Sequence, residues 1–242
     1  MDSGGFFDTS EFLDIDSFAL LCALKSMDLL ADSAAWWWPS ARSFEVVIGA
    51  ILTQNTKWEG VQKSLENLKN AGILSDDSDK SLESIARATT LETLIAPSGL
   101  YRQKSARIIA LARAILDEFG SFDEFALSVS REWLLRQKGV GFESADAILN
   151  YACGREIMVI DAYTARLIAS LGCEMSEYDA IQAWCMDMPR KSLEALYPGM
   201  PLAQIYARYH GKIVEFSKKK GRAKEIIKAI KAQQENASLG RA

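Results

Sequence analysis

The feature that most constrains the fold is a Gly-Val-Gly segment, residues 139–141. The stretch before it is apolar, and another helix-forming stretch begins immediately after it. Glycine relieves steric clashes in so short a turn, and the N–H groups at the start of the second helix suit a phosphate oxygen. The pattern predicts two helices joined by a short hairpin, about 131–153, in which Gly139 and Gly141 let the backbone approach another molecule closely.

One carboxylate, Asp161, follows the apolar run 157–160 and precedes another helical stretch. Its position alone favours an N-cap, because an aspartate there can accept hydrogen bonds from the first turn of the helix. A phosphate-binding hairpin followed by a single carboxylate also suggests an enzyme that acts on DNA. The two roles can coexist in one residue.

Apolar residues recur every three to four positions along most of the chain, which predicts an all-α protein. The run 157–160 is too short to indicate a sheet, and the polar tail extends a helix to about residue 230. The expected helices are 17–30, 44–54, 61–70, 80–95, 103–119, 131–137, 142–153, 162–171, 176–186 and 201–216.

The formal net charge of −4 argues mildly against a nucleic-acid partner. Basic residues are nevertheless concentrated between 212 and 231, and a locally basic face can bind a few phosphates. We therefore expect modest DNA affinity that falls as salt rises.

The four cysteines, Cys22, Cys153, Cys173 and Cys185, lack the spacing of a metal site or a disulfide framework. The acidic segment 1–16 lacks the basic start of a signal peptide, and no apolar run approaches the length of a membrane span. These features predict a cytoplasmic protein with reduced thiols and no membrane association.

Three segments in register resemble the endonuclease III, or helix-hairpin-helix-GPD, superfamily of DNA glycosylases. They are Leu-Thr-Gln-Asn-Thr at 52–56, Ser-Gly-Leu-Tyr-Arg-Gln-Lys-Ser-Ala at 98–106, and the hairpin with the aspartate that follows it. In order and rough spacing, the resemblance covers about residues 36–217. One hairpin alone would be weak support, whereas three segments in order are strong support.

The resemblance implies two helical lobes that flank an active-site cleft. One lobe combines 1–44 with 156–242, and the other is 45–155 and includes the hairpin. Members of the superfamily often carry four C-terminal cysteines that bind an iron–sulfur cluster, but this chain has no cysteine after Cys185. We therefore expect neither a metal nor another cofactor.

The resemblance gives Asp161 the catalytic role. Cleavage of an N-glycosidic bond builds positive charge on the sugar, and a nearby carboxylate lowers that barrier and can orient or deprotonate the attacking water. Glu143 stands where bifunctional members keep a nucleophilic lysine, and a carboxylate cannot form a Schiff base. This implies a monofunctional enzyme, in which Glu143 is either a pocket residue or an ordinary first-turn Glu favoured by the helix dipole. Lys138 is a phosphate neighbour or a surface lysine rather than a nucleophile.

An unusual aromatic run, Trp36-Trp37-Trp38-Pro39, is joined by Trp58. Excision needs the base to leave the stack, and aromatic walls suit an extruded base, especially a cationic alkylated purine. We expect Trp37, Trp38, Pro39 and Trp58 to line the base pocket; the alternative is that the tryptophans only pack the lobe junction. Four segments together look like the bacterial endonuclease III-like 3-methyladenine DNA glycosylases. They are Trp-Trp-Trp-Pro at 36–39, Thr-Gln-Asn-Thr-Lys at 53–57, Gly-Val-Gly-Phe-Glu-Ser-Ala-Asp-Ala-Ile-Leu at 139–149 and Tyr-His-Gly-Lys-Ile-Val-Glu-Phe-Ser-Lys at 209–218. One departure is Trp58, which stands where that group is expected to have a smaller Phe.

Opening a base pair leaves a hole in the duplex, and Gln54 and Leu100 fall at the family's gap-filling and wedge positions. The alternative for Leu100 is that it docks the helix that follows. Lys104 would contact a phosphate or, as a lone lysine, be solvated.

Two further lysines, Lys212 and Lys218, could approach the base pocket, and the simpler alternative is that they reach solvent by snorkelling. His210, the only histidine, is interpreted as a hydrogen-bonded structural residue rather than a general acid.

Together these features predict a monomeric, monofunctional DNA glycosylase of the bacterial cytoplasm that works at the nucleoid. Its partner would be double-stranded DNA that contains alkylated purines, with 3-methyladenine as the main substrate. The alternatives are a glycosylase for a mispaired or oxidised base, a non-catalytic helix-hairpin-helix protein that binds DNA, and a helical protein scaffold favoured by the acidic charge.

Overall fold

The computed structural model describes residues 15–239, and the acidic segment before residue 15 lies outside this range. The described residues form fourteen α-helices, one short 3-10 helix and one π-helix, with no β-sheet among them. The prediction of an all-α protein is confirmed. None of the helices between residues 15 and 239 combines the length and the apolar character of a membrane-spanning helix.

The chain divides into two compact units. Among the described residues, the central unit comprises 32–159 and 200–208, and the terminal unit comprises 15–31, 160–199 and 209–239. The sequence placed 32–44, 156–159 and 200–208 in the lobe of the chain ends, whereas these residues group with the central unit in the structure.

The side chains explain this difference. Trp38 packs into the core of the central unit. The backbone N–H of Arg42 donates to the Tyr151 carbonyl at 2.8 Å, and the Gln204 amide donates to the Ala35 carbonyl at 3.0 Å.

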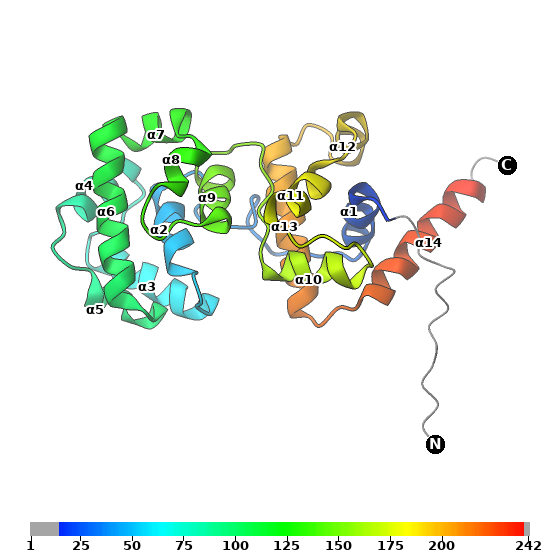
Figure 1. The fold of residues 1–242 in the computed structure, drawn as a ribbon, viewed down its shortest axis with the longest axis horizontal. Helices are drawn as coiled ribbons and strands as arrows, with labels where there is room; N and C mark the ends of the chain where they lie inside the picture. The colour runs from blue at the N-terminus through cyan, green and yellow to red at the C-terminus, as the bar shows by residue number, and fades with distance from the viewer. Residues whose placement is uncertain (1–14, 240–242) are drawn as a thin grey trace, which may run out of the picture. The chain divides into compact units, whose positions relative to one another are not determined.

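In the central unit, helices α2 to α9 follow one another along the chain (Figure 1), and η3 comes directly after α9. These elements are α2 Phe44–Leu52, α3 Trp58–Asn70, α4 Ser78–Arg87, α5 Glu92–Ile95, the 3-10 helix η2 Ala96–Ser98, α6 Tyr101–Phe119, α7 Phe122–Ser128, α8 Arg131–Leu135, α9 Phe142–Ala147 and the π-helix η3 Ile148–Ala152.

The core of this unit is built around α2, whose nine residues are all apolar or small except Glu45, and eight of them are buried. Such a helix is surrounded by other elements, and α3, α4, α6, α9 and η3 all pack against it. The long helix α6 buries one face, with Ile108, Leu111, Ala112 and Ile115, and leaves the other to solvent. Helix α6 also contacts α5 and η2, and the loops of the candidate site lie near its N-terminal end.

Two expected helices are interrupted. The stretch 80–95 breaks after α4, because Ala88 adopts an extended conformation with ψ 142° before α5 begins. The stretch 142–153 starts as α9 but continues as η3, a π-helix with a wider turn than an α-helix. The side chain of Asn150 in η3 donates to the carbonyls of Arg155, Ile157 and Ala203, which fixes the chain where it leaves the helix.

The terminal unit contains α1 Ser17–Ser26, α10 Ala162–Ser170, α11 Tyr178–Met186, α12 Arg190–Leu196, the residues of α13 Leu202–Lys218 from 209 onward, and α14 Ala223–Leu239. Helix α1 packs against α11 and α14. Within this unit the buried Ser17 hydroxyl donates to the Cys185 carbonyl at 2.8 Å and lies 3.2 Å from the Tyr209 hydroxyl. The tail helix α14 continues to Leu239, beyond the expected end near residue 230.

Candidate active site

Asp161 begins α10 as its N-cap. One carboxylate oxygen, Oδ1, accepts from the Thr164 backbone N–H at 2.8 Å and from the Thr164 hydroxyl at 2.9 Å. The other oxygen, Oδ2, lies 3.5 Å from Nε2 of His210 on α13. The predicted capping role is confirmed, and it uses only one of the two carboxylate oxygens.

The surroundings of Asp161 keep its carboxyl group ionised. Burial by itself would raise the pKa, but the charge of His210 and the hydrogen bonds from His210 and Thr164 outweigh burial and lower the pKa to about 2. Asp161 is therefore a carboxylate at neutral pH. It can stabilise positive charge or orient water, and it cannot donate a proton to a leaving base.

His210 and Lys212 are both buried on α13. Lys212 Nζ donates to the Leu29 carbonyl at 3.0 Å, so the expectation that Lys212 snorkels to solvent is wrong. Lys218 is exposed at the end of the same helix and does not share this environment. His210 lies against Asp161, in agreement with its interpretation as a structural residue, and this contact also lets it control the charge of the carboxylate.

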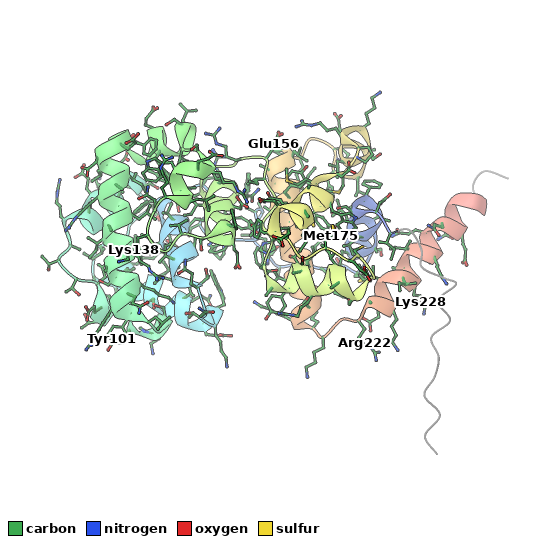
Figure 2. The ribbon with its side chains drawn as sticks, in the orientation of Figure 1. Tyr101, Lys138, Glu156, Met175, Arg222 and Lys228 are labelled. Carbon is green, nitrogen blue, oxygen red and sulfur yellow. The ribbon has the colours of Figure 1, made fainter. Side chains whose placement is uncertain are left out.

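The predicted hairpin consists of α8, the turn and α9, with Lys138 exposed at the turn (Figure 2). Gly139 has a φ of 83°, and a Cβ there would lie 2.4 Å from Nε of Arg107. Gly141 has a φ of −98° and open space around its missing Cβ. Within the protein, a Cβ would therefore clash at Gly139 and not at Gly141, and a close approach of both glycines to another molecule stays a prediction.

Glu143 is an exposed residue in the first turn of α9. Its position agrees with the helix-dipole interpretation and leaves a pocket role as a prediction.

Gln54 connects the end of α2 to the hairpin. Its Nε2 donates to the Gly139 carbonyl at 2.9 Å and to the Ser144 hydroxyl at 3.0 Å. Arg107 Nη1 on α6 donates to the Gln54 Oε1 at 3.2 Å. The amide of Gln54 thus supports the hairpin turn in this structure, and its gap-filling role stays a prediction.

Leu100 is a large apolar side chain that is 56% exposed. Its φ of 46° is left-handed, which is unusual for leucine, and it follows Gly99 with a φ of 64°. The exposed side chain is available for contact with another molecule, and both the wedge role and the docking of the next helix stay predictions.

Lys104 lies nowhere near solvent. Its side chain is buried to 1% exposure, and Nζ donates to the Leu52 carbonyl, the Thr56 hydroxyl and the Ser98 carbonyl at 2.8, 2.6 and 2.7 Å. Both expectations for this residue, a phosphate contact and a solvated lysine, are wrong. The loop ends around it supply carbonyl groups that need a donor, and the ammonium group satisfies them.

The aromatic residues form a cluster within the central unit. The Trp38 ring lies 5.0 Å from Tyr151, 5.6 Å from Trp58 and 6.4 Å from Trp37 between ring centroids. Trp38 is buried, Trp37 and Trp58 are half-buried, and Pro39 is exposed beside them. Trp38 packs into the core of the central unit, and its role in a base pocket stays a prediction.

A pocket wall made of the more open rings, Trp37 and Trp58, remains a prediction.

Sequence reasoning missed Tyr151, which lies 6.0 Å from Trp37 and completes the cluster. The only sequence signal was its place in the helix after the hairpin, and in the structure it is a buried residue of the π-helix η3.

The predicted residues fall into two sets, each placed within one unit. Asp161, His210, Lys212 and Lys218 belong to the terminal unit. The aromatic cluster, the hairpin, Gln54, Leu100 and Lys104 belong to the central unit. No group of three or more His, Cys, Asp or Glu side chains suited to a metal ion occurs among residues 15–239.

Comparison with known proteins gives the chain its family. Residues 48–186 match the HhH-GPD superfamily of base excision DNA repair proteins. A protein of Methanocaldococcus jannaschii, described provisionally as a DNA repair glycosylase, is 37% identical over 203 residues, which are 78% of this chain and 83% of that protein.

Comparison with solved structures supports the same family. The crystal structure of the 3-methyladenine DNA glycosylase MagIII of Helicobacter pylori, bound to 1,N6-ethenoadenine, shares 52% sequence identity and a TM-score of 0.83. The match covers 85% of this chain and 99% of that chain. A non-covalent endonuclease III–DNA complex matches over 84% of this chain and 86% of that chain, with 19% identity and a TM-score of 0.58, which shows likeness of fold. The chain therefore belongs to the HhH-GPD superfamily and is a DNA glycosylase of base excision repair.

Proposed function

We propose that this glycosylase removes 3-methyladenine and related alkylated purines from double-stranded DNA and leaves the abasic strand intact. The observation that carries the proposal is the state of Asp161, a largely buried carboxylate whose pKa is held at about 2. Such a group stabilises the positive charge that develops on the sugar, but it cannot protonate the leaving base.

A base that is already cationic suits this chemistry. N3-methylation places a positive charge on adenine within DNA, so the base departs without a strong proton donor. The indole faces of Trp37 and Trp58 would favour such a cation over a neutral purine. The 52% identity to the H. pylori 3-methyladenine DNA glycosylase supports the same substrate class.

The side chains also support a monofunctional reaction. An amine nucleophile is needed for a Schiff base with the sugar. Position 143 holds a glutamate, Lys104 Nζ is enclosed by three acceptors, and Lys212 Nζ is hydrogen-bonded to the Leu29 carbonyl. These side chains favour hydrolysis by a water molecule oriented at Asp161 over attack by an amine.

The test is release of free base from methylated duplex DNA by the purified protein, resolved by chromatography. We expect free 3-methyladenine, no strand scission on a denaturing gel, and no enzyme–DNA adduct after borohydride reduction. The Asp161→Asn protein, purified in the same way, is the control for a contaminating enzyme. Release of a mispaired or oxidised base instead would overturn the substrate class, and DNA binding without release of any base would overturn the enzyme.

A further inference from the structure

Lys104 is an enclosed cation without a counter-ion. It lies on the first turn of α6 and is 1% exposed. Across the part of the chain that the structure describes, no carboxylate forms an ion pair with Lys104; its three partners are two carbonyl oxygens and a hydroxyl. A buried charge is costly unless it is well hydrogen-bonded, and the three acceptors around Nζ offset that cost.

The three acceptors end two segments that are far apart in sequence. Leu52 is the last residue of α2, and Thr56 lies in the loop that follows it. Ser98 is the last residue of η2. The Thr56 hydroxyl is itself hydrogen-bonded to the Ser98 carbonyl, so the ammonium group and the hydroxyl together tie the two loops to each other and to α6.

Each tied loop carries one residue that could enter a duplex. The loop after α2 carries Gln54, two residues before Thr56, and the loop after η2 carries the exposed Leu100, two residues after Ser98. One turn further along α6, Arg107 bonds to Gln54 and packs against Gly139 of the hairpin. The start of α6 therefore contacts all three backbone segments of the candidate DNA interface within the central unit.

We propose that Lys104 is a positioning residue that holds the Gln54 and Leu100 loops at one fixed separation, so that both side chains enter the DNA together when the base is extruded. The inference rests on the proposed function, since it supposes an enzyme that flips bases. Lys104 itself touches neither substrate nor phosphate. Its contribution is to remove the freedom of two loops before DNA binds.

The charge of Lys104 makes this arrangement sensitive to pH. Burial, with a smaller contribution from the nearby Arg107, lowers the pKa of Lys104 to about 8. Arg107 on α6 is the charged group that acts on it, and the groups that face it from α2, the following loop and η2 are the uncharged Leu52, Thr56 and Ser98 oxygens. Above that pH the neutral amine has two N–H donors for three acceptors, and its lone pair faces an oxygen.

The first experiment compares two substrates in the wild-type and Lys104→Met proteins. One duplex carries the methylated base opposite thymine, and the other carries it opposite a tetrahydrofuran residue, where the base is already partly unstacked and needs less insertion. We expect Lys104→Met to lose at least about tenfold in kcat/KM on the paired duplex relative to the second one. Lys63→Met, which removes an exposed lysine of α3 in the same unit, should leave that ratio unchanged.

The second experiment needs no variant of Lys104. For the wild-type protein, the ratio of the two kcat/KM values should fall as pH rises from about 6.5 to about 9.5, with a midpoint near the lysine pKa. Thr56→Val should lower the ratio at all pH values, and Thr56→Ser, which keeps the hydroxyl, should restore it. A merely structural lysine would change both substrates equally, so an unchanged ratio in the folded Lys104→Met protein or across this pH range would overturn the inference.

A binding measurement separates this inference from the proposed function. Affinity for a duplex that contains a tetrahydrofuran site opposite thymine requires insertion but no base release. If no methylated base is released by the wild-type protein, the proposed function fails; a tenfold weaker binding of that duplex by Lys104→Met or Thr56→Val would still support the positioning role. Equal binding by wild type and both variants would contradict it.

Discussion

Replacement of Asp161 by asparagine separates the charge of this side chain from its shape. Asparagine is as good an N-cap as aspartate, so its Oδ1 can keep accepting from the Thr164 N–H and hydroxyl at the start of α10. The helix should therefore stay capped. What is lost is the negative charge beside His210, whose Nε2 lies 3.5 Å from the other oxygen.

The cost of that loss follows from the pKa of Asp161. The folded protein lowers it from 3.8 to about 2, and at about 1.36 kcal/mol per pH unit this difference stabilises the fold by about 2 kcal/mol at neutral pH. We expect Asp161→Asn to lower the free energy of unfolding by that amount. For a chain of this size, the melting temperature should fall by about 4–8 °C.

The pH dependence of the stability difference shows whether the lost negative charge causes it. Because the folded pKa lies below the unfolded one, the stabilisation is fully present above about pH 4 and is lost as pH falls through about 2. Denaturant unfolding of both proteins between about pH 7 and about pH 2 should therefore show a difference in the free energy of unfolding at neutral pH that disappears in acid. A difference of the same size at every pH would show that asparagine disturbs packing, and no difference at neutral pH would refute a carboxylate held ionised by His210 and Thr164.

The same variant tests the chemistry. If Asp161 stabilises the charge on the sugar, its neutral amide should lower kcat for base release by about 10²–10³-fold or more, far beyond the effect of a modest loss of stability. Activity is measured at a temperature where circular dichroism shows both proteins folded. A folded Asp161→Asn protein with wild-type activity would remove Asp161 from the mechanism.

Three further substitutions probe the central unit. Gly139→Ala should lower the free energy of unfolding, measured in urea, by about 1–3 kcal/mol, because the left-handed φ and the Arg107 side chain both oppose a Cβ. Gly141→Ala is the matched control, and an equal effect of the two substitutions would refute the steric argument. Leu100→Ala should change the free energy of unfolding by less than about 0.5 kcal/mol, since the side chain is exposed. It should nevertheless lower kcat/KM on paired DNA by about tenfold. A large loss of stability with normal activity would instead indicate helix docking. Trp58→Phe, which keeps an edge contact to Trp38 with a smaller ring, should raise excision of bulkier adducts relative to 3-methyladenine by about threefold, and an unchanged ratio in competition assays would show that Trp58 does not limit the pocket.

The long helices could be predicted because their signals are local. The helices α2, α6 and α10 begin or end within two residues of the expected positions, where an apolar repeat meets a capping residue such as Ser43, Gly120 or Asp161. The short helices α7 and α12 were missed. A cap was visible for α7, since Ser121 accepts from the Glu124 N–H, but seven residues are too few to establish a repeat.

The burial of Lys104 is a feature that sequence patterns do not predict. A single lysine after Gly-Leu-Tyr is ordinarily on the surface, and its burial depends on the carbonyls of Leu52 and Ser98, which are 46 positions apart in the chain. No periodicity reports that two loop ends meet at one point. The identity of Lys104 as an important residue could be predicted from the family segment, whereas its role could not.

The segment that carries the tryptophans was also unpredictable in conformation. Five residues in it or just before it, none of them glycine, have a positive φ: Asp28, Leu30, Trp37, Ser40 and Arg42. Leucine, tryptophan and arginine have no intrinsic preference for that region of backbone space. Their conformations are imposed by contacts made after folding, such as the ring packing of Trp37 against Tyr151.

The π-helix η3 changes the direction in which the side chains at the end of the hairpin's second helix point. Residues of an α-helix advance by about 100° each, so a turn with one additional residue rotates the later side chains by about that angle relative to an uninterrupted α-helix. A chain one residue shorter before Tyr151 would keep the hairpin and the composition of the cluster, yet its tyrosine ring would point about a quarter-turn away from Trp38. The aromatic cluster thus depends on residue count as well as on residue identity, and a comparison of homologues that aligns the tryptophans while allowing a gap at 148–152 would pair clusters of different ring geometry.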